Sequence, residues 1–331
     1  MPLGTLLRAY RATGADPPFG DPRRAHHGVA MEGYFWRLTD PRRGRVVIAL
    51  CGVNRASDGG HWATVALAAH PGGFLRQAAV PRAGADPAGL GAWAHAGAFD
   101  GGPRHVRVDL GEDARLDVEL DDVREWGRRT FGGVGAAHAV PGLSQYWHPH
   151  VLGGTARGRA VLGDEVVELD GARVYAEKNW GRAGFPDRWW WGQAVGFEDP
   201  EVCVAFAGGE VRAGPARLDA SALAVRVGDR LVRIGQPLLS PVRAEVRDGH
   251  WRLRGRGPRW AVEVEATANP GAAHALPVPV PHERRNVPGA HQHLDGRLRV
   301  AVRRRGRLVY RGESALAGLE RGDLVAARGD G

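Results

Sequence analysis

The sequence predicts an all-β protein built from two similar β-barrels in tandem, and its composition gives the first indication. Gly (49 residues) and Pro (22) are abundant, while the long amphipathic patterns typical of α/β enzymes are missing. Frequent turn-forming residues between short apolar runs favour strands joined by many turns. The chain has 331 residues, of which 43% are apolar and 25% charged, so it resembles a soluble globular protein with two medium domains.

The elements follow from this pattern in chain order. Residues 1–27 are rich in Pro, Gly and Arg and are predicted to be irregular, with a short turn of helix at 6–11. From Gly28 onward, polar and apolar residues alternate in short runs, as in half-buried strands. The strands predicted in the first half are 32–39, 45–53, 62–68, 104–110, 114–120, 145–151, 156–162, 165–169 and 173–180.

The same pattern continues in the second half. The strands predicted there are 189–197, 202–208, 222–227, 230–234, 244–246, 250–255, 260–266, 296–303 and 307–313. Turn pairs such as Asp170-Gly171, Asp248-Gly249 and Asp295-Gly296 separate them. A spacing of about ten residues with alternation is typical of a β-barrel or a sandwich.

An internal similarity favours two barrels over one. Residues 33–41 form an aromatic strand that turns at Asp-Pro and leads to a strand with Cys51, and residues 189–200 lead in the same way to Cys203. Repetition at half the chain length indicates a tandem fold, although two unrelated hairpins would give the same pattern. The predicted division is an irregular segment (1–27), a first barrel (28–184) and a second barrel (185–331).

The charge and the cysteine content limit which binding partners and which cellular compartment are expected. The net charge is +8, but the Arg residues are spread along the chain and no nucleic-acid motif is present, so we predict no nucleic-acid partner. Two cysteines in apolar runs indicate buried free thiols and a reducing compartment. Because no signal peptide or membrane-spanning run is visible, we predict a cytoplasmic protein whose basic surface is compatible with contact to the inner face of a membrane.

The densest motif surrounds the only lysine of the chain. Lys178 is one of 45 basic residues and lies in the segment 175–181, eight residues before the run 189–191 of three tryptophans. A lysine at this one place suggests a compact ammonium that a planar guanidinium does not replace. The alternatives are chance, or a Lys stem that packs on Trp.

Alternation along this strand separates its side chains into two faces. Tyr175, Glu177 and Asn179 project to one side, whereas Lys178 and Trp180 project to the other. Polar groups beside indole rings are typical of an apolar pocket that binds a small molecule. An apolar wall would raise the pKa of Glu177 and make it an acid, but Glu177 could equally form a structural ion pair.

Two histidine pairs could in principle bind a metal. His148 and His150 share one strand face, as do His291 and His293, and together they could supply three or four ligands. Neither pair has a supporting carboxylate pattern, so we predict no metal and expect these rings to face solvent or line a cavity.

These residues resemble the tocopherol cyclase family. The similarity is most specific over residues 177–181, Phe185-Pro186, Trp189, Trp191 and Gln193. It extends to residues 32–35, to Trp147 with the glycine pair 153–154, and to segments 260–269 and 296–318. The resemblance therefore covers residues 28–318, with a weak match over 70–145.

The resemblance implies two tandem lipocalin-like β-barrels and a chemical activity. Members of this family close a chromanol ring on a prenylated hydroquinone. An acid protonates the alkene nearest the ring, and the phenol oxygen attacks the resulting tertiary cation. The implied partner is a hydrophobic small molecule, and no cofactor is implied.

The resemblance also suggests residue roles. Glu177 would donate the proton, with Glu32 as the alternative, and Lys178 would tune Glu177 or hold the loop 181–186. Tyr175 and Asn179 would orient the phenol or relay the proton. The expected substrate-binding residues are Tyr34, Trp147, His148, Trp180, Trp189, Trp191 and Gln193.

Other functions stay open at this point. Arg-dominated composition suggests a bacterium with a GC-rich genome, and His148 and His150 depart from the plant pattern, so the substrate could be another isoprenoid or an aromatic polyketide. A non-catalytic carrier would have the same cavity, with Glu177 in an ion pair and a wide open mouth. A structural role, as the seam between the two barrels, would bury Glu177, Lys178 and Trp180 with no cavity beside them.

Overall fold

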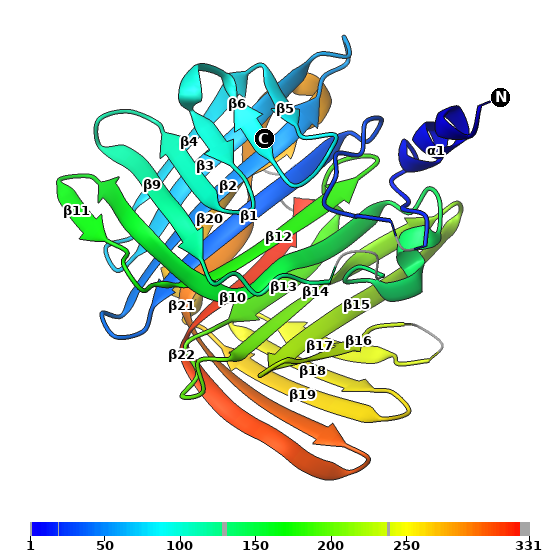
Figure 1. Cartoon of the computed structure of the whole chain (residues 1–331), viewed down its shortest axis with the longest axis vertical. Helices are drawn as coiled ribbons and strands as arrows, with labels where there is room; N and C mark the ends of the chain where they lie inside the picture. Colours follow the sequence, from blue (N-terminus) through cyan, green and yellow to red (C-terminus); the bar gives the residue numbers. More distant parts are fainter. Residues whose placement is uncertain (1, 19, 128–130, 237–238, 325–331) are drawn as a thin grey trace.

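The computed structural model describes residues 2–18, 20–127, 131–236 and 239–324, and it confirms the all-β prediction (Figure 1). The first sheet contains β1 (Met31–Asp40), β2 (Arg45–Arg55), β3 (His61–His70), β4 (Leu75–Pro81), β5 (Ala83–Ala85), β6 (Ala92–Ala94), β7 (Phe99–Gly101), β8 (His105–Asp109), β9 (Ala114–Asp121), β10 (Gln145–Leu162), β11 (Glu165–Glu168) and β12 (Arg173–Gly181). The second contains β13 (Arg188–Ala194), β14 (Val202–Ala213), β15 (Ala216–Val227), β16 (Arg230–Ile234), β17 (Val242–Arg247), β18 (His250–Arg256), β19 (Trp260–Thr267), β20 (His274–Val280), β21 (Arg285–Arg304) and β22 (Arg307–Asp323).

Helical segments are short. They are α1 (Leu3–Arg11) and the 3-10 turns η1 (His95–Gly97), η2 (Gly135–Ala139), η3 (Pro270–Ala272) and η4 (Pro281–Glu283). None of the helices in the described part of the chain has the length and apolar character needed to cross a membrane.

The two sheets repeat one connectivity. The first has the order β4-β3-β2-β1-β12-β10-β9-β8-β7-β6-β5, and the second has the order β16-β15-β14-β13-β22-β21-β19-β18-β17. In each, the opening strand lies between the second strand and the last, and the strands listed are paired antiparallel. The similarity between 33–51 and 189–203 therefore lies in equivalent parts of the two sheets.

The predicted closed barrels are not found. In the described residues, no ladder of hydrogen bonds joins β4 to β5 or β16 to β17, which are the edges of the two sheets. Arg82 (φ 61°) turns the chain directly from β4 into β5, and the three residues of β5 pair with β6. Each sheet is thus a curled, open structure whose edges are connected through the chain.

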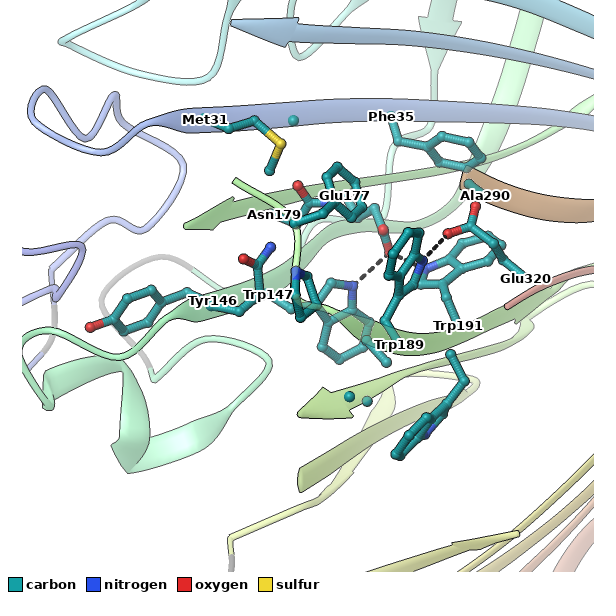
Figure 2. A pocket seen from close by; sticks show the side chains of 18 of the residues that line it. Met31, Phe35, Tyr146, Trp147, Glu177, Asn179, Trp189, Trp191, Ala290 and Glu320 are labelled. Atoms are coloured by element: carbon teal, nitrogen blue, oxygen red, sulfur yellow. Dashed lines mark hydrogen bonds between the residues drawn. The ribbon is translucent and has the colours of Figure 1, made fainter. Parts of the chain in front are cut away.

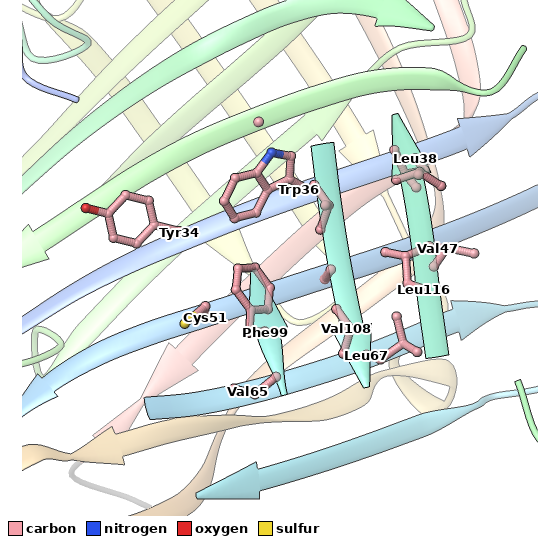
Figure 3. Close-up of a cluster of buried hydrophobic side chains, with 14 of the residues drawn as sticks. Tyr34, Trp36, Leu38, Val47, Cys51, Val65, Leu67, Phe99, Val108 and Leu116 are labelled. Carbon is pink, nitrogen blue, oxygen red and sulfur yellow. The ribbon is translucent and has the colours of Figure 1, made fainter. Parts of the chain in front are cut away.

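Both faces of the central strands are buried, which explains their nearly continuous apolar sequence. On one face of β1, Tyr34, Trp36 and Leu38 fill the interior of the first sheet (Figure 3). On the other face, Phe35 packs against Trp191 of the second sheet, with ring centroids 5.3 Å apart. The second sheet has its own interior, around Phe206, Leu223, Leu253, Val264 and Val300.

Several elements differ from the predicted ones. Strands β4 to β7 and β20 were not predicted, and β10, β21 and β22 are longer than expected. In β10, Gly153 and Gly154 (φ 136° and 138°) form the bulge that lets one long strand replace two predicted short ones. The predicted domain boundary at 184/185 lies in the connection between β12 and β13 and stays a prediction.

Candidate active site

A cavity of ≈ 260 Å³ lies where the two sheets meet. One water needs about 10–15 Å³ of such space, so the cavity can hold a small organic molecule. Its wall combines apolar side chains of both sheets and their connections, such as Met31, Phe35, Leu50, Phe185, Leu276 and Ala290.

Glu177 is the central polar group of this wall. Its side chain projects from β12, and Oε2 accepts hydrogen bonds from Trp147 Nε1 (2.7 Å) and Trp191 Nε1 (2.8 Å) (Figure 2). The Tyr175 hydroxyl donates a third hydrogen bond to the same oxygen (2.5 Å). Oε1 accepts none from the residues that the structure describes. The donors come from β10, β12 and β13, so both sheets position this carboxyl.

The environment of Glu177 acts on its ionisation in two directions. Burial raises the pKa of Glu177 above its usual range, while the hydrogen bonds from Tyr175, Trp191 and Trp147 oppose this increase. Burial and the neighbouring Glu177 raise the pKa of Tyr175 well above its usual range, so Tyr175 stays a neutral donor. No described cation forms an ion pair with Glu177.

A second carboxyl, which the sequence did not identify, belongs to Glu320 on β22. Glu320 lies opposite Trp191 in the ladder between β13 and β22, and Trp189 Nε1 donates to its Oε1 at 2.5 Å (Figure 2). Burial raises the pKa of Glu320 to about 7, with the Trp189 hydrogen bond opposing and the charge of Glu177 contributing to the increase. Glu320 was missed because the predicted strand ended at residue 313.

Two amides add polar atoms to the wall. The Asn179 side chain packs over Gly33. A Cβ atom at position 33 would lie 2.5 Å from Asn179 Oδ1, which is too close, so glycine leaves the space that Asn179 occupies. Gln292 on β21 lies opposite Glu320, is fully buried and lines the cavity. Neither its Oε1 nor its Nε2 has a hydrogen-bond partner in the described structure. These unpartnered atoms are available to a bound molecule.

The structure brings only part of the predicted site to the cavity. Among the predicted residues, those that line it are Tyr34, Trp147, Glu177, Asn179, Trp189 and Trp191. Tyr175 lies behind Glu177 and touches its carboxyl. The others, Glu32, His148, Lys178, Trp180 and Gln193, do not line the cavity.

Lys178 and Glu32 are on the opposite face of their strands, in a buried polar cluster. Lys178 Nζ is 2.9 Å from Glu32 Oε2 and from His26 Nδ1, and it donates to the Arg24 carbonyl at 2.8 Å. Burial raises the pKa of Glu32, but the charges of Lys178 and His26 and the hydrogen bonds from both residues together outweigh burial and leave this pKa below its usual range. The expected roles of Lys178 in tuning Glu177 and of Glu32 as alternative donor therefore have no geometric support.

Trp180 belongs to the same cluster. Its ring stacks on His26 with centroids 4.4 Å apart, and its Nε1 donates to the Gly14 carbonyl at 2.7 Å. Together Lys178 and Trp180 attach the N-terminal segment to the first sheet, a different role from the seam between two barrels that the structural alternative expected. Gln193 is also buried, next to Cys203.

The histidine expectations are corrected as well. His148, His150 and His293 are buried, and only His291 of the two pairs is exposed. His148 packs on Trp126 and His150 on Trp36, away from the cavity. In the described part of the chain, no three His, Cys, Asp or Glu side chains gather to hold a metal ion.

Comparison with known proteins gives related sequences and folds. The chain is 29% identical over 226 residues to "Probable tocopherol cyclase, chloroplastic" of Oryza sativa subsp. japonica, a match covering 64% of this chain and 47% of that protein. It is 26% identical to "Tocopherol cyclase, chloroplastic" of Zea mays, with the same coverage. The chain therefore spans about half the length of the curated relatives it matches.

Solved structures share the fold. CghA bound to Sch210972 matches with a TM-score of 0.61 and 13% identity, over 89% of this chain and 88% of that one. Kievitone hydratase from Nectria haematococca matches with a TM-score of 0.53 and 10% identity, over 91% of this chain and 90% of that one.

A family model places the sequence more firmly than any single relative. The model described as "Tocopherol cyclase-like" matches residues 92–323, which include β10, β12, β13 and β22 and therefore both carboxyl groups of the cavity. This match covers well over half of the chain, and the chain thus belongs to the tocopherol cyclase-like family.

Proposed function

We propose that this protein catalyses an isomerisation in which a carboxylic acid of the cavity protonates the alkene of a prenylated phenol and the phenol oxygen closes a chromanol-type ring. The observation that carries the proposal is the Glu177 carboxyl. It lines an apolar cavity and is held by two indole N–H groups and one phenol, without a cation.

The wall suits the demands of this chemistry. Protonation of a trisubstituted alkene creates a tertiary cation, which water would trap if it entered. The indole rings of Trp147, Trp189 and Trp191 can exclude water and stabilise the cation through their π faces. Proton transfer from a carboxyl is effective when the attacking oxygen is already placed, and Asn179 offers an amide for that placement.

The comparisons support the reaction class. The curated relatives carry tocopherol cyclase names, and a hydratase is among the proteins with the same fold. A hydrophobic prenylated phenol is the substrate class that matches both the names and the apolar wall. The basic composition of the chain, +8 at neutral pH, would favour approach to an anionic membrane surface where such a substrate dissolves.

A carrier of hydrophobic ligands would need the same cavity but no acid. For a carrier, we expect from the sequence that Glu177 forms an ion pair. No cation in the described part of the chain pairs with that carboxyl. Burial instead raises the pKa of Glu177, which is a cost to folding that binding alone does not require.

The test is incubation of the purified protein with a short-chain prenylated hydroquinone without oxygen, followed by chromatography and mass spectrometry. We expect a product of unchanged mass and new retention time, and a loss of at least about 100-fold in rate for Glu177→Gln. Glu313→Gln, at a partly exposed glutamate on β22 that forms ion pairs with Arg297 and Arg299, is the matched control. Saturable quenching of Trp fluorescence without isomerisation would instead support the carrier.

A further inference from the structure

The two carboxyls of the cavity are held in different ways. Glu177 Oε2 accepts three hydrogen bonds, whereas Glu320 accepts one, from Trp189. In both residues the second oxygen, Oε1 of Glu177 and Oε2 of Glu320, has no donor among the described residues and is free for a ligand.

This difference bears on which carboxyl is charged. Hydrogen bonds donated to a carboxylate stabilise its charged form, so three donors favour ionised Glu177 over ionised Glu320. Two carboxyl groups in one apolar cavity also resist being ionised together. With one proton between the two carboxyls, the donor count favours Glu320 as its holder.

We propose that Glu320 is the proton donor of the reaction and that Glu177 is the ionised partner that takes the phenol proton. This assignment rests on the proposed function and revises the donor expected from the sequence. The ligand occupies the space that both residues line, with the alkene at Glu320 Oε2 and the phenol hydroxyl at Glu177 Oε1.

The step balances without a co-reactant. The π electrons of the alkene form a C–H bond with the Glu320 proton, and the O–H bond of Glu320 breaks. A lone pair of the phenol oxygen forms the C–O bond with the tertiary cation, and the phenol proton passes to Glu177. A proton then returns from Glu177 to Glu320, so the enzyme regains its starting state and the product is an isomer of the substrate.

The surroundings of the pair agree with this division. Glu177 is the charged group that acts on Glu320, and Tyr175 is the titratable group in contact with Glu177. Burial raises the pKa of both carboxyls, that of Glu320 to about 7, so the proton is both present and transferable near neutral pH.

The location of the proton can be tested without a substrate. Infrared difference spectra between pH 6 and pH 9 report the C=O band of a carboxylic acid that loses its proton in this range. We expect the band in the wild type and in Glu177→Gln, and its loss in Glu320→Gln. Loss of the band in Glu177→Gln and its survival in Glu320→Gln would overturn the assignment.

The use of the proton can be tested with the phenol blocked as its methyl ether, so that only alkene protonation is observed. In D₂O, reversible protonation places deuterium in the recovered substrate. We expect Glu177→Gln to exchange within about 10-fold of wild type and Glu320→Gln to lose at least about 100-fold. Glu313→Gln controls for the substitution, and near-ultraviolet circular dichroism verifies that each variant is folded.

The outcomes separate the two proposals. Exchange that is lost in Glu177→Gln but kept in Glu320→Gln, or lost in both, contradicts the assignment of roles while leaving the cyclase proposal intact. If the wild type neither exchanges nor cyclises, the proposed function fails, and the donor role of Glu320 fails with it. The infrared spectra then still decide which carboxyl holds the proton.

Discussion

At the scale of single residues, Lys178 is the clearest case of a side chain whose role depends on its face of the strand. It is adjacent to Glu177 in sequence, yet its ammonium is fully buried 2.9 Å from Glu32 on the other side of the sheet. The ammonium also lies 4.8 Å from the centroid of the Trp180 ring. A compact cation fits between a carboxylate, an imidazole and two aromatic rings where a guanidinium would need more space.

Removing this cation should destabilise the protein. Lys178→Met leaves Glu32 buried without its partner, and breaking a buried pair in this way costs about 3–5 kcal/mol in free energy of unfolding. Urea denaturation followed by Trp fluorescence measures the loss. The double variant Lys178→Met/Glu32→Gln should recover most of it, and a double variant as unstable as the single one would contradict the ion-pair explanation.

In contrast to Lys178, Gln292 should contribute to ligand binding and not to the stability of the fold. Its amide has no partner in the described structure, so Gln292→Leu removes a buried polar group that folding does not satisfy. We expect an unchanged or higher melting temperature and weaker binding of a hydroquinone, by about 5–10-fold. A matched ligand without the second hydroxyl should bind both proteins equally in Trp-quenching titrations. A fall in melting temperature would show that the amide serves the fold.

Sequence reasoning identified Glu177 and the indoles because they lie in one short segment where alternation is enough to place them. Glu320 and Gln292 are more than 100 residues away from that segment along the chain, and they reach the cavity only through the pairings of β22 with β13 and β21. Such long-range register cannot be read from local periodicity.

At the scale of elements, β13 links the two carboxyls. Trp189 and Trp191 share one face of this strand and donate to Glu320 and Glu177, respectively. Trp190 projects to the other face, into the interior of the second sheet, and donates to Ser221. The run of three tryptophans therefore serves two purposes, with alternate residues building the cavity and the core.

The two indoles on the cavity face should control different limbs of the pH profile. The Trp189 hydrogen bond lowers the pKa of Glu320, so Trp189→Phe should raise it above about 7 and move the alkaline fall of kcat/KM to higher pH. Trp191→Phe should raise the pKa of Glu177 and move the acidic limb to higher pH. Trp190→Phe should leave both limbs in place, and a shared shift in all three variants would contradict this separation.

Element boundaries were harder to predict than element types. Alternation in 145–162 is interrupted at Gly153-Gly154, which separates two strands in sequence but only makes a bulge in β10. The three-residue strands β5 to β7 are too short to give a periodic signal, and they exist because neighbouring strands supply their partners.

At the scale of the whole molecule, the repeated topology was predictable and the open sheets were not. Two similar hairpins, each with an aromatic strand and a Cys-bearing strand, occupy equivalent places in the two sheets. The geometry of one turn, such as that at Arg82 between β4 and β5, affects whether the two edge strands of a sheet form hydrogen bonds with each other. The amino-acid composition contains no information about a single turn.

Buried histidines should make the molecule sensitive to acid. Burial lowers the pKa of His26 and His148 well below the usual range, that of His138 to about 4 and that of His150 to about 3. These rings stay neutral when folded but take up protons near pH 6.5 when unfolded, so their contribution is present above about pH 6.5 and is lost as the pH falls.

The two cavity carboxyls act in the opposite direction, because folded Glu177 and Glu320 bind protons before the unfolded chain does. The buried histidines outnumber these carboxyls, so the free energy of unfolding should fall as the pH drops below about 6.5, by about 1.4 kcal/mol per pH unit for each extra proton that the unfolded chain binds. Urea unfolding at pH 7.5 and 5.5 measures it. His150→Leu, which removes one of the four rings, should reduce the slope by about one proton, and an unchanged slope would contradict the assignment.

The central claim is that an acid of this cavity adds a proton to carbon and that the phenol oxygen then closes the ring. The most direct test is one turnover of a prenylated hydroquinone in D₂O without oxygen, with the product returned to H₂O and analysed by mass spectrometry and NMR. We expect one retained deuterium, on the carbon that was the protonated end of the alkene. A cyclised product without deuterium on carbon, or no product at all, would contradict it.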